Sequence, residues 1–362
     1  MKKMVGWIGI LTMLLAFTGC AKQDNIPNKT DTIAPVVSNQ ISTIPSIVPS
    51  STPEVKQRDI GKYRITDVIH SEALKNNLVG EKVDRDVFVY LPPSYYDSDK
   101  KYPVLFYLHG HQESPGGYFA SSTPLFDESA EAGNQEFIVV FVDGASQHGG
   151  SFYVNSVVTG NWEDYVVNEV VGYVDKNYRT IANKDSRGIF GFSMGGFGAL
   201  NLAMKHPDVF GAVFSMSPGL IADGDMDLAM DSWYGDTEFK IAYGRAFSPN
   251  TKNKEDYANI PAFDGSKADN KIIAQWENGF GNINAKVKDY CSKKTKLKAI
   301  KILYGENDDY TWIPLGSKAL GAALGKNGIE CEVESFSGGH FIKQGVAKDE
   351  IAPFFAKYLV VK

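Results

Sequence analysis

The sequence predicts an α/β fold: a mostly parallel sheet with an antiparallel edge on its N-terminal side and helices on both faces. Residues 63–69 and 83–91 alternate apolar and polar side chains, as half-exposed antiparallel strands do. Residues 104–108 form a continuous apolar run, which is typical of a strand buried on both faces. Beyond this point strand patterns alternate with helix patterns, which indicates parallel strands joined by helical crossovers.

The remaining elements follow this alternation to the C-terminus. Expected strands cover residues 137–142, 189–190, 212–216, 300–304 and 331–336, and expected helices cover residues 162–178, 196–205, 315–324 and 350–359. One connection, about 80 residues long, is far longer than such connections usually are. Within it, residues 270–291 are expected to include a helix that packs on the sheet.

The same long connection contains an aromatic-rich insertion, assigned to about residues 219–268. An insertion at the carboxyl end of a strand lies beside the ligand site of an open α/β sheet. We therefore expect a lid or a wall of the substrate site. The alternative is a structural excursion that packs its own aromatic side chains.

Composition limits the partners that the protein can have. The chain has 362 residues, of which 43% are hydrophobic and 22% charged, and this is enough for a large core. Its formal net charge is −6, so neither nucleic acid nor an anionic membrane surface is expected to bind it through charge.

The first 20 residues resemble a bacterial lipoprotein signal peptide. Lys2 and Lys3 precede a short apolar run, and Cys20 stands directly at its end after a small residue. We expect Cys20 to be lipidated and to anchor the chain, outside the cytoplasm, to the bacterial cell membrane or envelope. An ordinary secretory signal is the alternative. Residues 21–57, rich in Ser, Thr and Pro, are expected to be a disordered tether, and residues 58–362 to be the globular domain.

Two cysteines remain, Cys291 and Cys331, and the sequence leaves open whether they pair or stay free thiols. No further cysteine or histidine lies at ligand spacing from them, so no metal site is expected there. Residues 223–227 begin like a calcium loop but lack its later glutamate, and are interpreted as a solvated turn.

The strongest chemical signal is Gly191-Phe192-Ser193-Met194-Gly195, placed between an apolar strand and a helix. This is the arrangement of a nucleophile elbow, in which a sharp turn exposes the serine hydroxyl at the carboxyl end of the sheet. Glycines on both sides allow close backbone approach because they lack a Cβ. The alternative is a glycine-rich turn that contains a serine by chance. The flanking strand and helix favour the elbow.

A serine hydroxyl needs a base and an orienting acid. His340 lies in a glycine-rich loop after the last expected strand, where it can reach Ser193. Asp308 follows another strand at the same edge and is preferred as the acid over Asp309 and Glu306. The chain order Ser, acid, His is that of the α/β-hydrolase fold.

The tetrahedral intermediate also needs N–H donors. The expected donors are the backbone of Met194, directly after the nucleophile, and the backbone of His111 in the loop after the third strand. The side chains of His109 and His111 suggest a metal pair, but no third ligand accompanies them, so a role in shaping the loop is expected.

These residues resemble a known family. The elbow region 191–200 looks like that of the putative-esterase (esterase D-like) group of α/β-hydrolases, whose feruloyl and acetylxylan esterases form carbohydrate esterase family 1. Further similar segments are residues 108–110, 151–156, 162–165, 173–180, 305–308 and 339–340. The resemblance spans about residues 83–355. It places the nucleophile on Ser193, the acid on Asp308, the base on His340 and the oxyanion donors on Met194 and His111, and it implies no metal or organic cofactor.

The resemblance implies a serine carboxylic ester hydrolase acting on feruloyl or acetyl esters of plant cell-wall polysaccharides such as xylan. Aromatic residues near loops favour feruloyl groups, and Tyr153, Trp162, Trp233 and Trp312 are candidate surfaces for stacking against sugars or phenolic acids. One alternative is an acyltransferase of the same fold, in which a sugar accepts the acyl group. The other is a non-catalytic lipoprotein that binds saccharides.

Overall fold

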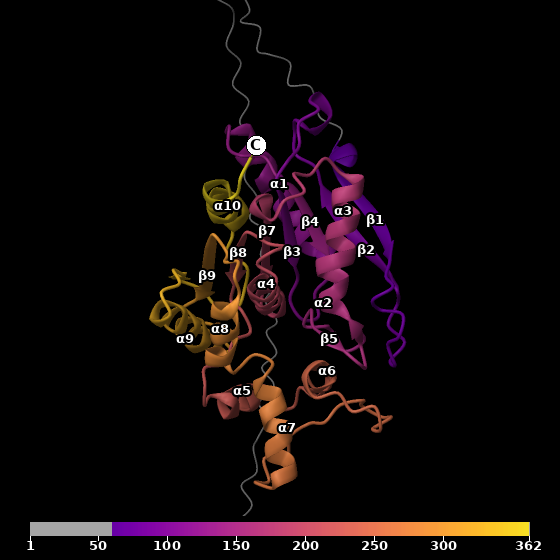
Figure 1. The fold of residues 1–362 in the computed structure, drawn as a ribbon, viewed down its shortest axis with the longest axis vertical. Helices are drawn as coiled ribbons and strands as arrows, with labels where there is room; N and C mark the ends of the chain where they lie inside the picture. Colours follow the sequence, from indigo (N-terminus) through magenta and orange to yellow (C-terminus); the bar gives the residue numbers. More distant parts are fainter. Residues whose placement is uncertain (1–59, 362) are drawn as a thin grey trace, which may run out of the picture. The chain divides into compact units, whose positions relative to one another are not determined.

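An eight-stranded sheet forms the centre of the fold, in the order β1-β2-β4-β3-β7-β8-β9-β10 (Figure 1). The computed structural model describes residues 60–361. The expected signal peptide, lipidation at Cys20 and tether therefore lie outside the described residues. The strands are β1 (Arg64–His70), β2 (Asp84–Tyr90), β3 (Val104–Leu108), β4 (Ile138–Val142), β7 (Arg187–Phe192), β8 (Ala212–Met216), β9 (Ala299–Gly305) and β10 (Glu332–Phe336).

Strand directions confirm the predicted α/β fold. The pairs β4–β3, β3–β7, β7–β8, β8–β9 and β9–β10 are parallel, whereas β1–β2 and β2–β4 are antiparallel. The two early alternating segments are thus the antiparallel edge. A separate two-stranded ribbon consists of β5 (Asn155–Ser156) and β6 (Gly160–Asn161).

Both faces of the central sheet are covered, which explains the continuous apolar run at 104–108. Successive side chains of a strand point to opposite faces. Val104, Phe106 and Leu108 accordingly belong to one hydrophobic cluster, and Leu105 and Tyr107 to the other. All five are fully buried.

The helices surround this sheet. They are α1 (Pro115–Glu131), α2 (Trp162–Asp164), α3 (Val171–Asn177), α4 (Met194–Lys205), α5 (Met226–Ser232), α6 (Thr237–Phe247), α7 (Lys267–Glu277), α8 (Ile283–Ser292), α9 (Trp312–Lys326) and α10 (Ala352–Tyr358). Two π-helical segments, η3 (Tyr165–Val170) and η5 (Ala347–Ile351), extend α2–α3 and α10. The 3-10 turns are η1 (Ile60–Tyr63), η2 (Tyr95–Asp97) and η4 (Lys184–Ser186). Among the described residues, no helix is long and apolar enough to cross a membrane.

The long connection after β8 contains α5, α6, α7 and α8. Figure 1 shows α5, α6 and α7 together beyond one end of the sheet. Their aromatic side chains pack on one another: the ring centroids of Trp233 and Tyr243 are 5.2 Å apart, and those of Tyr243 and Trp276 are 4.9 Å apart. The aromatic rings of the segment therefore pack on one another, as one of the two expectations held, and they are continuous with the main hydrophobic cluster through Phe152 and Trp312.

Cys291 and Cys331 are both free thiols in the structure. Burial raises the pKa of the Cys331 thiol to about 12, so this group is a weak nucleophile.

Candidate active site

Ser193 occupies a strained turn between β7 and α4. Its φ is 54° and its ψ is −116°, a conformation that residues with a side chain rarely adopt. A Cβ on Gly191 would lie 2.2 Å from the carbonyl oxygen of Gly195, and a Cβ on Gly195 would lie 2.0 Å from that of Leu108. Both glycines are thus required by close backbone contacts, as the elbow pattern predicts.

The structure brings Ser193, His340 and Asp308 together in one chain of hydrogen bonds. The distance from Ser193 Oγ to His340 Nε2 is 2.9 Å, and that from His340 Nδ1 to Asp308 Oδ2 is 2.8 Å. The Asp308 side chain is fully buried, and its other oxygen accepts from the Tyr310 backbone N–H at 2.9 Å. Because a carboxylate only accepts, Nδ1 carries the proton and Nε2 is free to accept from the serine hydroxyl.

The other candidate acids do not reach His340. Asp309 is exposed, and Glu306 accepts a hydrogen bond from the Ser335 hydroxyl at 2.8 Å. Aromatic rings hold the imidazole from two sides: the centroids of Phe192 and Tyr310 lie 4.9 and 5.0 Å from that of His340. The base is therefore fixed in orientation by both packing and its carboxylate partner.

Backbone donors are available beside Ser193. Met194 is the first residue of α4, so its N–H precedes the helical hydrogen bonds, which begin with Phe197 N–H to the Ser193 carbonyl. The Gly110 N–H is already used, since it donates to Glu113 Oε2 at 2.8 Å. The backbone N–H of His111 makes no hydrogen bond within residues 60–361, as an oxyanion donor requires before substrate binds.

The side chains of the two loop histidines have other partners. His109 is fully buried, and its Nε2 accepts from the Gly144 N–H at 3.0 Å. The His111 Nε2 donates to the carbonyl oxygen of His148 at 2.8 Å, and burial lowers the pKa of His111. Within the described part of the chain, no group of three or more His, Cys, Asp or Glu side chains is placed to hold a metal ion.

A cavity of about 240 Å³ opens around the Ser193 hydroxyl. Trp233 and Trp312 line it, as the sequence suggested, and the Trp312 Nε1–H donates to Ser232 Oγ at 2.9 Å. The cavity is completed by Gly110, His111, Gln112, Glu113, Phe192, Ser232, Asp236, Phe239, Tyr310 and His340. Asp236 and Phe239 belong to the insertion that was expected to form a wall of the substrate site. Glu113 and Tyr310 were not expected, and of these two only Tyr310, two residues after the acid, had a position that could have indicated it.

The expectation that Tyr153 and Trp162 contact substrate is wrong. Both side chains are fully buried and neither lines the cavity at Ser193. The Tyr153 hydroxyl donates to the carbonyl oxygen of His109 at 3.0 Å, and the Trp162 indole donates to that of Thr159 at 2.9 Å. These aromatics have satisfied polar atoms and belong to the core.

Comparison with protein families identifies the family of this chain. The family model described as "Putative esterase" matches residues 81–320. The chain belongs to this family. Among curated proteins, the chain is similar to an esterase of Mycobacterium tuberculosis, 36% identical over 135 residues, which are 36% of this chain and 28% of the relative.

An endo-1,4-beta-xylanase/feruloyl esterase of Xylanibacter ruminicola is 26% identical over 165 residues, which are 43% of this chain and 23% of the relative. The chain described here thus spans about a quarter of the length of these two curated relatives.

Solved structures share the fold. A ferulic acid esterase aligns with a TM-score of 0.57 at 23% identity, over 82% of this chain and 97% of the other. An S-formylglutathione hydrolase from Agrobacterium tumefaciens aligns with a TM-score of 0.55 at 17% identity, over 82% and 95% of the two chains. At these identities the likeness shows the α/β-hydrolase fold.

Proposed function

We propose that this protein is a carboxylic ester hydrolase that uses Ser193 as its nucleophile. The observation that carries the proposal is the hydrogen-bonded chain from Ser193 Oγ through His340 to buried Asp308, built on a strained elbow. A surface serine or a saccharide-binding site has no need of this combination. Membership of the esterase family supports the same reaction class.

In the proposed reaction, Ser193 Oγ attacks the ester carbonyl carbon while its proton passes to His340 Nε2. The N–H groups of Met194 and His111 stabilise the oxyanion. Collapse of this intermediate breaks the bond to the alcohol, which takes the proton from His340. Water then attacks the acyl group on Ser193 by the same steps, releasing the acid and restoring the hydroxyl.

For the substrate, we propose acyl esters of plant cell-wall polysaccharides such as xylan, with feruloyl favoured over acetyl. The support is the aromatic lining of the catalytic cavity, in which Trp233, Phe239, Tyr310 and Trp312 lie around Ser193. Such rings pack against a phenolic acyl group and have no partner in an acetyl group. The ferulic acid esterase of similar fold adds support.

The test compares the wild-type chain with Ser193→Ala on methyl ferulate and on acetylated xylan. We expect the variant to lose a thousandfold or more in kcat/KM, roughly as removal of a catalytic nucleophile does. The matched control is Ser121→Ala, an exposed serine on α1. The better substrate identifies the acyl group. Equal inactivity of wild type and variant, together with oligosaccharide binding, would instead indicate a binding lipoprotein.

Added sugar acceptors distinguish the acyltransferase. Hydrolysis to free acid in their presence supports the esterase, and an acylated sugar as the main product contradicts it. We further propose that a lipid on Cys20 holds the enzyme at the cell envelope. In that case Cys20→Ala moves the protein from the membrane fraction to the soluble fraction, and an unchanged membrane fraction contradicts the anchor.

A further inference from the structure

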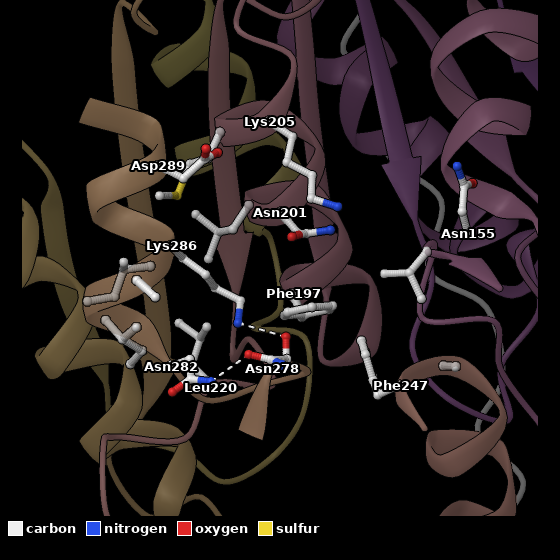
Figure 2. A pocket seen from close by; sticks show the side chains of 17 residues that line it. Asn155, Phe197, Asn201, Lys205, Leu220, Phe247, Asn278, Asn282, Lys286 and Asp289 are labelled. Carbon is white, nitrogen blue, oxygen red and sulfur yellow. Dashed lines mark hydrogen bonds between the residues drawn. The ribbon is translucent and has the colours of Figure 1, made fainter. Parts of the chain in front are cut away.

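A second cavity, of about 420 Å³, lies along α4 beyond its first turn (Figure 2). It is lined from α4, α6, α8 and the segment before α8, and it shares no lining residue with the cavity at Ser193. Its volume is within the range of small-molecule sites. The function proposed above does not use it.

One wall of the second cavity is aromatic and aliphatic. Phe197 on α4 and Phe247 on α6 meet edge to face, with ring centroids 5.9 Å apart at an angle of 82°. Leu200, Leu220 and Leu320 extend this apolar surface. Such a wall suits the flat face of an aromatic ring better than the hydroxyl-covered face of a sugar.

Helix α8 adds a cation that has no carboxylate in direct contact among the described residues. Lys286 on α8 extends into the cavity, where its ammonium donates to the carbonyl oxygens of Asn278 at 3.0 Å and Gly281 at 2.5 Å. Within residues 60–361, no carboxylate lies within 4.0 Å of this nitrogen. An ammonium has three protons, so one remains for a ligand. Burial lowers the pKa of Lys286 to about 8.

The neighbouring charges are already paired or bonded elsewhere. Lys205 on α4 is 2.7 Å from Glu163, and Asp289 on α8 is 3.3 Å from Lys293. The Asp223 carboxylate accepts from the Ile283 N–H and from the Asn284 amide. Among the described residues, Lys286 therefore has no carboxylate within 4.0 Å, and the Asp223 charge acts on it only from further away.

An amide donor faces the same space. Asn201 lies on α4 one turn after Phe197, and its buried Nδ2 has no hydrogen-bond partner in the described part of the chain. Asn201, Lys286 and Phe197 all line this cavity, and Figure 2 labels their side chains. A buried donor left unpaired costs about 1–3 kcal/mol. This cost is recovered if a ligand oxygen accepts from it.

We propose that the second cavity binds a small aromatic monocarboxylate. The carboxylate accepts from the Lys286 ammonium and from Asn201 Nδ2, and the ring packs against Phe197 and Phe247. A single negative charge fits because this one ammonium has only carbonyl oxygens as partners among the described residues. A neutral saccharide would leave that ammonium uncompensated. The proposal stands independently of ester hydrolysis at Ser193.

The experiment is calorimetric titration of the full-length protein with trans-cinnamate, its neutral isostere trans-cinnamamide, and xylotriose. We expect cinnamate to bind at least about tenfold more tightly than cinnamamide, because a charge-assisted hydrogen bond is lost in the amide. Xylotriose is expected to show no binding that depends on Lys286.

The decisive variant is Lys286→Met, with Lys288→Met as its matched control, since Lys288 is exposed two residues further along α8 and does not line the cavity. Lys286→Met should weaken cinnamate binding about tenfold or more and leave cinnamamide binding unchanged. Lys288→Met should stay within about twofold of wild type. Thermal melting verifies that each variant folds.

Lys286→Arg keeps the charge and should keep most of the affinity, which separates loss of charge from loss of loop structure. Hydrolysis of methyl ferulate should be the same in Lys286→Met and wild type, since Lys286 lies outside the catalytic cavity. The proposal is overturned if Lys286→Met folds and binds cinnamate as wild type does. It is also overturned if cinnamamide binds as tightly as cinnamate, or if no titrant binds.

Discussion

Helix α4 contributes to two cavities. The polar side chains of one cavity hydrogen-bond to one another, whereas two polar side chains of the other lack such partners among the described residues. At its N-terminus, Ser193, His340 and Asp308 satisfy one another in a single hydrogen-bonded chain. Along its side, and counting only residues 60–361, the Lys286 ammonium has no carboxylate in contact and Asn201 Nδ2 has no hydrogen-bond partner. A site prepared for chemistry must hold its groups in place before substrate arrives. A site that binds an anion can instead contain hydrogen-bond donors that have no partner until the ligand accepts from them.

The largest effect should come from breaking the hydrogen-bonded chain at its buried end. Asp308→Asn leaves the shape intact but removes the carboxylate that fixes the His340 tautomer, so kcat on methyl ferulate should fall by roughly a thousand- to ten-thousandfold. Steady-state kinetics measure this. Asp309→Asn, at the exposed neighbouring position, should stay within about threefold of wild type. Similar losses in both variants would contradict the assignment of Asp308 as the acid.

A second large effect should come from the backbone of the elbow. In Gly195→Ala the new Cβ meets the carbonyl oxygens of Leu108 at 2.0 Å and His109 at 2.6 Å. Because these are backbone atoms that cannot rotate away, unfolding free energy should fall by about 3 kcal/mol or more. Urea denaturation measures the change.

The matched control for that substitution is Gly172→Ala in α3, where a Cβ has no neighbour within 4 Å. Here alanine should stabilise the helix by about 0.5–1 kcal/mol. Equal and small effects at the two glycines would show that the elbow tolerates a side chain, which contradicts the close contacts described.

The Lys286 ammonium in the second cavity predicts a pH dependence of cinnamate binding. Lys286 binds a carboxylate in its protonated form, and its pKa is lowered to about 8 by burial. Affinity should therefore be full below pH 7 and should fall above pH 8 by up to about tenfold per pH unit. The ligand acid stays ionised over this range. Titrations between pH 6 and 9.5 test the slope.

Three other charged groups near Lys286 must be considered in this profile: Lys205 from α4, Asp223 from the segment after β8, and Asp289 from α8 itself. The Lys205 ammonium is paired with Glu163, and Asp289 is paired with Lys293. Lys286→Arg keeps its charge and should give a flat profile. A fall of the same size in the arginine variant would assign the titration to another group.

The smallest effect concerns stability. In Asn201→Leu an unpaired buried donor is replaced by an apolar side chain of similar size, so unfolding free energy should rise by about 1 kcal/mol while cinnamate binding weakens. Denaturant unfolding and calorimetry on the same samples measure both changes. A loss of stability would show that Asn201 supports the fold and is not held open for a ligand.

Much of the fold was predictable because its signals are local. Runs of apolar residues located the parallel strands, and the glycine pattern around Ser193 follows from backbone contacts that only glycine permits. Helix α1 was missed because Gly116, Gly117 and Pro124 weaken its helical pattern, and packing against the sheet overrides that weakness.

The side-chain environment was harder to predict. Sequence alone does not say whether an aromatic residue faces a cavity or the core, and Tyr153 and Trp162 proved to be core residues. The second cavity joins Asn201 and Lys286, which are far apart in the chain and carry no shared motif. The charge around Lys286 depends on which carboxylates lie close to it, and only the folded structure determines their distances.

Trapping the acyl group tests the role of Ser193 as the nucleophile. The full-length protein is mixed with 4-nitrophenyl acetate, quenched in acid within the first turnover, digested and mapped by mass spectrometry. We expect acetyl on the hydroxyl of Ser193 and no acetylated peptide from Ser193→Ala. Release of acetate with the acyl group on another residue, or with no acylated intermediate at Ser193, would contradict the role given to this serine.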